Sequence, residues 1–131
     1  MINMNSKTRI FIAEDEKTLC EIYTERFLRA NYEVTCFGNG LDLLEALATD
    51  TPDVILLDIN MPEMNGLEVL KSIKENFASK DKQNIPVIVW SNLSSDTDVS
   101  AAKKAGATEY LKKVEFSGDD LVQRVSSILK K

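Results

Sequence analysis

Short apolar runs alternate with segments of helical periodicity along the whole chain. The apolar runs predict strands at residues 9–13, 34–37, 54–57, 87–90 and 109–113. Between and after these runs, apolar residues recur every three or four positions and predict helices near residues 19–30, 41–48, 67–77, 95–105 and 118–129. Strands that alternate with helices indicate an α/β domain, with a parallel sheet covered by helices on both faces.

The alternation continues without a linker, a repeat or a low-complexity segment. A chain of 131 residues is long enough for one domain with its own core and too short for two of ordinary size. We therefore expect a single domain over residues 1–131, in which residues 1–8 form a frayed polar leader. No further domain follows Lys131 in the sequence, so we expect either a stand-alone protein or a domain excised from a longer one.

Composition and charge narrow the kind of partner. The chain is 44% hydrophobic and carries a net charge of −5, which argues against nucleic acid or an anionic membrane as a direct partner. No apolar run approaches the ~18 residues of a membrane span, and the N-terminus lacks a signal-peptide pattern. Cys20 and Cys36 show no metal-ligand spacing. We interpret both as reduced core residues of a cytoplasmic protein rather than as a disulfide pair.

The candidate chemistry rests on carboxylates. The chain contains no histidine, which excludes histidine-based acid–base catalysis, phosphotransfer from its own histidine and histidine metal ligation. Glu14 and Asp15 directly follow the first predicted strand, and Asp58 directly follows the third. Ser91 and Lys113 end the fourth and fifth strands. Since ligands bind at the carboxyl ends of strands in open α/β sheets, these side chains are candidates for one site.

A cluster of these carboxylates favours a metal ion. Two carboxylates about 4.5 Å apart repel each other by roughly 3–4 kcal/mol at an effective dielectric constant of ~20. A hard divalent cation relieves this repulsion, and carboxylate and carbonyl oxygens suit Mg²⁺ or Mn²⁺. We expect the positive charge of Lys113 to offset part of the repulsion when the metal is absent.

The sequence resembles the receiver domain of bacterial two-component response regulators, chemotaxis regulators included, from Arg9 to Leu129. The matching motifs are the acidic pair Glu14-Asp15, residues 58–66 (DINMPEMNG), the strand-end Ser91 and residues 106–113 (GATEYLKK). The resemblance implies a flavodoxin-like, doubly wound sheet of five parallel strands in the order 2-1-3-4-5 with five helices. In that order, the loops after the first and third strands adjoin.

The resemblance also implies a role for each site residue. Asp58 would be the phosphoacceptor, and Asp15, Asp58 and the backbone carbonyl of Asn60 would bind Mg²⁺, with Glu14 acting through a water molecule. Lys113 and Ser91 would contact the phosphoryl group, and Tyr110 would be the aromatic residue that turns inward on activation.

The implied function is Mg²⁺-dependent phosphoryl transfer to Asp58 from a sensor histidine kinase, a phosphotransfer protein or a small phosphodonor. The chain would catalyse only its own phosphorylation and dephosphorylation and is not expected to be a conventional enzyme. Phosphorylation would switch a face formed by the fourth helix, the fifth strand and the fifth helix, which would bind a downstream protein.

Three positions depart from the family pattern. Glu14 replaces the commoner Asp, Asn92 stands where Ala is usual, and Val114 stands where Pro usually follows the lysine. A cis peptide bond before a non-proline residue costs ~2.5–4 kcal/mol, so we expect a trans Lys113–Val114 bond.

Three alternative functions remain open. The departures keep open a pseudo-receiver that acts as a docking domain without phosphorylation. A phosphatase of the haloacid-dehalogenase type needs a second carboxylate two residues after the nucleophile, where this chain has Asn60. A flavodoxin-like nucleotide binder is disfavoured because the acidic first loop would repel phosphate.

Overall fold

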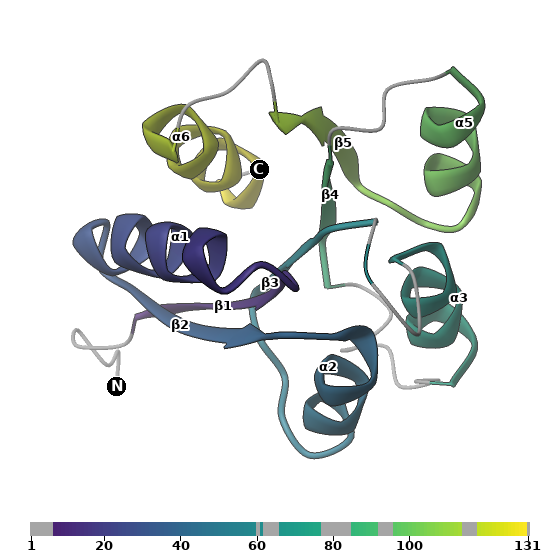
Figure 1. Ribbon diagram of the computed structural model, residues 1–131, viewed down its shortest axis with the longest axis horizontal. Helices are drawn as coiled ribbons and strands as arrows, with labels where there is room; N and C mark the ends of the chain where they lie inside the picture. The colour runs from purple at the N-terminus through teal and green to yellow at the C-terminus, as the bar shows by residue number, and fades with distance from the viewer. Residues whose placement is uncertain are drawn as a thin grey trace.

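The structure is a computed structural model that describes residues 7–59, 61, 66–76, 85–91, 96–113 and 118–130. Five strands and five helices alternate along these residues (Figure 1). The elements are β1 (Thr8–Ala13), α1 (Lys17–Arg29), β2 (Tyr32–Phe37), α2 (Gly40–Leu47), β3 (Val54–Leu57), α3 (Gly66–Asn76), β4 (Val87–Ser91), α5 (Asp96–Lys104), β5 (Glu109–Lys112) and α6 (Gly118–Leu129).

The strands form one parallel sheet in the order β2-β1-β3-β4-β5. This confirms the doubly wound, flavodoxin-like fold with the strand order 2-1-3-4-5. The chain reverses its direction of winding between β1 and β3, so the loops that follow these two neighbouring strands lie side by side at the carboxyl edge of the sheet.

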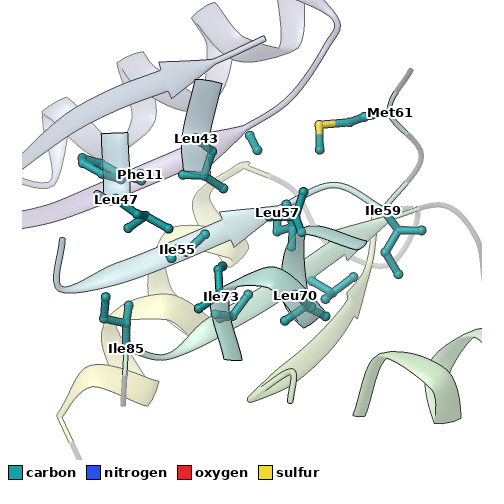
Figure 2. Packing of buried hydrophobic residues seen from close by; sticks show 14 of the residues in the cluster. Phe11, Leu43, Leu47, Ile55, Leu57, Ile59, Met61, Leu70, Ile73 and Ile85 are labelled. Atoms are coloured by element: carbon teal, nitrogen blue, oxygen red, sulfur yellow. The ribbon is translucent and has the colours of Figure 1, made fainter. Parts of the chain in front are cut away.

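Successive residues of each strand point to opposite faces of the sheet and build two separate cores. On one face, β1, β3 and β4 contribute side chains that pack under α2, α3 and α5; this cluster includes Phe11, Ile55, Leu57 and Ile73 (Figure 2). On the other face, the intervening residues pack under α1 and α6, as Figure 1 shows for the two helices. The central strand β3 is buried along its whole length, as expected for a strand covered on both sides.

Two predicted helix ends are confirmed by the backbone. Asn31 follows α1 with a φ of 70°, and Gly106 follows α5 with a φ of 111°. Both values lie in the left-handed region that Asn and Gly adopt most readily, and this conformation ends a helix. Asn39 is the N-cap of α2, where its side-chain oxygen accepts a hydrogen bond from the backbone N–H of Asp42 at 2.8 Å.

Two expectations are corrected. Cys20 and Cys36 form a disulfide bond, so the interpretation as reduced core residues is wrong. Residue Cys20 lies in the first turn of α1 and Cys36 in the neighbouring strand β2; this places their Cα atoms 6.2 Å apart, within the range that a disulfide spans. In addition, β1 begins at Thr8, inside the predicted leader, because Thr8 pairs with Tyr32 of β2.

Candidate functional site

The carboxyl ends of β1 and β3 hold two acidic side chains in register. Ala13 and Leu57, the last residues of the two strands, are paired across the sheet, and Glu14 and Asp58 follow them. The backbone N–H of Asp58 donates to the carbonyl oxygen of Ala13 at 3.1 Å, and that of Glu14 donates to the carbonyl oxygen of Phe37 at 2.9 Å. The start of each loop is therefore fixed to the sheet.

Glu14, Asp15 and Asp58 form a carboxylate cluster. One oxygen atom from each residue lies within 4.8 Å of the corresponding atoms of the other two. The residues differ in exposure, since Glu14 is 2% and Asp58 6% exposed, whereas Asp15 is exposed. The structure thus brings together the three acids that sequence reasoning placed at one site, with one of them open to solvent.

Lys113 reaches this cluster from the far side of β4. Its Nζ atom lies 2.9 Å from Oε1 of Glu14 and 3.3 Å from Oδ2 of Asp58, and its side chain is 13% exposed. Ser91 ends the intervening strand β4, pairs with Lys112 in the sheet and is buried. Tyr110 lies on β5, half-buried against the core under α2, α3 and α5.

Burial and charge shift the ionisation of two groups. Burial raises the pKa of Glu14 above its ordinary value; the hydrogen bond from Lys113 opposes this shift, and the negative charge of Asp58 adds to it. Burial also disfavours the charged form of Lys113, but the hydrogen bond to Glu14 and the charges of Asp58 and Glu14 outweigh it. The pKa of Lys113 is therefore raised.

The donor set fits a hard divalent cation. Three carboxylates and one ammonium group leave two formal negative charges, which one divalent cation neutralises. The cluster is oxygen-only and has one exposed member, which suits an ion that keeps water molecules in its coordination shell, such as Mg²⁺. Asn60, whose carbonyl oxygen was predicted as a further ligand, lies outside the described residues, as do Asn92 and Val114 with its bond to Lys113.

Gly66 shows why the loop after Asp58 ends at a glycine. A Cβ atom on Gly66 would lie 2.6 Å from Cα of Ile59 and 2.7 Å from the carbonyl oxygen of Asp58. The N–H of Gly66 donates to the carbonyl oxygen of Ile59 at 2.9 Å, which holds the first turn of α3 against the strand end. The start of α3 is therefore hydrogen-bonded to Ile59, the residue that follows Asp58.

Tyr23, in the first predicted helix, lies near the site, where its charged residues act on the tyrosine. It is 7% exposed on α1, and its ring packs edge-to-face on Trp90 with centroids 6.0 Å apart. Burial raises the pKa of Tyr23, and the charges of Lys113, Glu14 and Asp58 act on its hydroxyl group. The helical spacing of Tyr23 is the same as that of an ordinary core residue, so the sequence carried no signal for this proximity.

The comparisons with known proteins define the class. Residues 10–126 match the model of the response regulator receiver domain. The chain is 37% identical over 117 residues to the transcriptional regulatory protein CrdR of Helicobacter pylori, covering 89% of this chain and 53% of that protein. It is 33% identical to the response regulator SaeR of Staphylococcus aureus, covering 93% and 50%. This chain therefore spans about half the length of the curated relatives it matches.

Solved structures agree with this assignment. The receiver domain of the Francisella response regulator 1452 superimposes with a TM-score of 0.83 at 29% identity, covering 95% of this chain and 98% of that one. The chemotaxis protein CheY4 of Vibrio cholerae shares the fold, with a TM-score of 0.85 at 23% identity, covering 94% and 99%.

The chain belongs to the receiver domain family of two-component response regulators. None of the helices in the described part of the chain is long and apolar enough to cross a membrane.

Proposed function

We propose that the chain is a single receiver domain in which Asp58 accepts a phosphoryl group with the help of Mg²⁺ or Mn²⁺. The observation that supports this most directly is the position of Asp58. It is a nearly buried carboxylate at the end of the central strand, within 4.8 Å of two other acids and 3.3 Å from Lys113. Burial of this carboxylate beside two other acids costs free energy, which the ion pair with Lys113, shared with Glu14, offsets only in part.

In this proposal an oxygen of the Asp58 carboxylate attacks the phosphorus atom of the donor. The new O–P bond forms as the bond to the leaving group breaks, and the donor's nitrogen or oxygen keeps the electron pair. Asp15, Asp58 and the backbone carbonyl of Asn60 would hold the metal ion, with Glu14 acting through a water molecule, and the bound ion would supply positive charge to the phosphoryl oxygens. The transfer needs no histidine from this chain, because the kinase or phosphotransfer protein supplies it.

Lys113 and Ser91 complete the proposed phosphoryl site. Phosphorylation makes the Asp58 side chain about one charge more negative. Because the pKa of Lys113 is raised, its amine stays protonated and can pair with this added charge. Ser91 ends the strand beside Asp58, where its hydroxyl group would donate to a phosphoryl oxygen. A pull on the end of β4 would shift α5, and Tyr110 on the next strand would turn inward.

The proposed output is binding of a downstream protein at the face formed by α5, β5 and α6. These are the fourth helix, fifth strand and fifth helix in chain order. The partners that deliver the phosphoryl group would be a sensor histidine kinase or a phosphotransfer protein, in the cytoplasm. No direct contact with nucleic acid or membrane is proposed for this domain, in keeping with its net charge of −5.

The experiment is incubation with acetyl phosphate and Mg²⁺ followed by intact-mass measurement. The wild-type chain should gain the mass of one phosphoryl group, and EDTA or the substitution Asp58→Asn should abolish the gain. The matched control is Asp53→Asn, which changes an exposed aspartate just before the same strand and retains an oxygen able to accept from the N–H of Arg9. No mass gain in the wild-type chain would overturn the proposal and favour a docking domain that acts without phosphorylation.

A further inference from the structure

A lysine-lined groove lies between α3 and α5, on the sheet face away from α1 and α6. The two helices are neighbours in Figure 1, and the groove between them has a volume of about 550 Å³. This volume is within the ~300–1,000 Å³ typical of ligand sites. Its walls carry Lys71 and Lys74 from α3 and Lys104 from the last turn of α5.

The groove is positively charged on a negatively charged protein. Three lysines and one acid, Glu75, line it, while the whole chain has a net charge of −5. Lys71 and Lys104 are exposed, and none of the carboxylates that the structure describes forms an ion pair with either of them. The field at this groove therefore attracts anions against the overall charge of the domain.

The groove also has an apolar part and an ordered lysine. Leu67, Ala101 and Ala105 line it with half-buried aliphatic groups. The stem of Lys74 packs over Gly106, where a Cβ atom would lie 2.6 Å from its Cε atom. Packing of this stem reduces the conformational entropy that Lys74 would lose when it binds a ligand.

Helix-end electrostatics accounts for only part of this arrangement. Lys74 and Lys104 lie in the last turns of their helices, where cations interact favourably with the helix dipole. Lys71 lies in the interior of α3 and gains less from this effect. The dipole also does not explain why lysines of two helices converge on one groove that contains aliphatic groups.

We propose that this groove binds an acidic segment of a partner protein, with one aliphatic side chain of the segment on Leu67, Ala101 and Ala105 and its flanking carboxylates on the lysines. The lysines favour an acidic occupant by charge complementarity. The aliphatic groups of the groove favour a peptide over a simple anion, because only a peptide has an apolar side chain that can pack on them. The site lies on the α3 side of α5, a helix that it shares with the proposed output face, and no residue of β5 or α6 lines it. Its occupation does not require phosphorylation of Asp58, so this proposal stands or falls independently of the proposed function.

The test uses the whole chain and a fluorescein-labelled synthetic peptide that has one leucine flanked by aspartates and glutamates. We expect saturable binding by fluorescence anisotropy, weakened by added salt, with amide shifts at residues 71, 74, 101, 104 and 105. Replacing Lys71 and Lys104 together by Glu should weaken binding roughly tenfold or more. The matched control is the pair Lys7→Glu and Lys130→Glu, which makes the same change in net charge with exposed lysines near the opposite edge of the sheet. The fluorescence of Trp90 checks that each variant is folded.

Each result decides the proposal. Loss of binding in the groove variant but not in the control supports it, as does loss when the leucine is replaced by serine. Equal weakening by the control pair overturns it, because attraction would then be non-specific. Amide shifts centred on Tyr110 and Lys112 overturn it by placing the peptide on the output face. Binding of inorganic pyrophosphate that matches the peptide, with no effect of the leucine, overturns it in favour of a small-anion site.

Discussion

The charge of Glu14 is predicted to destabilise the metal-free domain, although Glu14 makes the shorter ion pair with Lys113. The substitution Glu14→Gln removes this charge and keeps a side-chain oxygen that can accept the lysine hydrogen bond. We expect the variant to be more stable than the wild type at neutral pH in EDTA. The physical reason is that burial holds the pKa of Glu14 above its ordinary value of 4.5, so the folded state disfavours the ionised form.

The magnitude follows from the distances. Asp58, with an oxygen within 4.8 Å, repels the Glu14 carboxylate by at least about 3.5 kcal/mol at an effective dielectric constant of ~20, and the exposed Asp15 adds a smaller repulsion that solvent screens. The attraction to Lys113 at 2.9 Å is about 6 kcal/mol on the same scale. The repulsion offsets a large part of this attraction, so the desolvation of a carboxylate that is 2% exposed, the largest cause of the raised pKa of Glu14, decides the sign. An incompletely compensated buried group costs about 1–3 kcal/mol, which is the expected gain in stability.

The pH dependence has the same origin. Because the pKa of Glu14 is higher in the folded state, the folded state binds more protons. The stabilisation from this group is complete below pH 4.5 and is lost as the pH rises through the folded-state pKa. The Glu14→Gln variant should lack this decline. Added Mg²⁺ should reverse the order by stabilising the wild type more than the variant.

Urea unfolding followed by the fluorescence of Trp90, the only tryptophan, measures these effects. Glu21→Gln is the control, since it removes an exposed carboxylate on α1 and should change the free energy of unfolding by less than about 0.5 kcal/mol. A Glu14→Gln variant that is less stable than the wild type in EDTA would refute the reasoning. It would show that the ion pair with Lys113 outweighs the cost of burying the carboxylate.

Three further predictions concern other parts of the domain. Gly66→Ala should destabilise the domain by about 1–3 kcal/mol in urea unfolding, because the new Cβ atom would clash with the backbone of Asp58 and Ile59. Gly38→Ala is the control and should have little effect, since no atom lies within 4 Å of its new Cβ atom; equal effects of the two substitutions would contradict this. Reduction of the Cys20–Cys36 disulfide should lower stability by about 3 kcal/mol for a loop of this length, and a double serine variant should not respond to the reductant. Fluoroberyllate with Mg²⁺ should shift the amide resonances of α5, β5 and α6 more than those of α1, and larger shifts on α1 would argue against the proposed output face.

Much of the fold could be predicted because its elements carry local signals. Each strand is a short apolar run, and Asn31 and Gly106 mark helix ends through a backbone preference of the single residue. The strand order could not be predicted from local signals, because an apolar run does not indicate which strands lie beside it. The predicted order came from the family resemblance. The disulfide could not be predicted, because Cys20 and Cys36 are brought together by the packing of α1 beside β2 and their spacing matches no known motif.

The sequence identifies candidate residues for the site but not the contacts between them. Acids after two strands, a serine and a lysine after two others can be read from the sequence once the strands are placed. The pairing of Lys113 with both Glu14 and Asp58 depends on how far a side chain on the outer strand β5 reaches across the end of β4. The proximity of Tyr23 to the site likewise depends on how α1 packs against the sheet, which no local sequence pattern specifies.

The contacts of Lys113 suggest why the longer acid matters at position 14. The Glu14 side chain brings its carboxylate to 2.9 Å from Nζ, nearer than the 3.3 Å of Asp58. In the metal-free domain the lysine is therefore shared, with its closer contact on the residue that is not the proposed phosphoacceptor. A divalent cation bound by the acids would repel the ammonium group and weaken both contacts. Lys113 would then be available to a phosphoryl oxygen on Asp58. The metal ion would thus both neutralise the acids and release the ammonium group of Lys113 to bind the phosphoryl group.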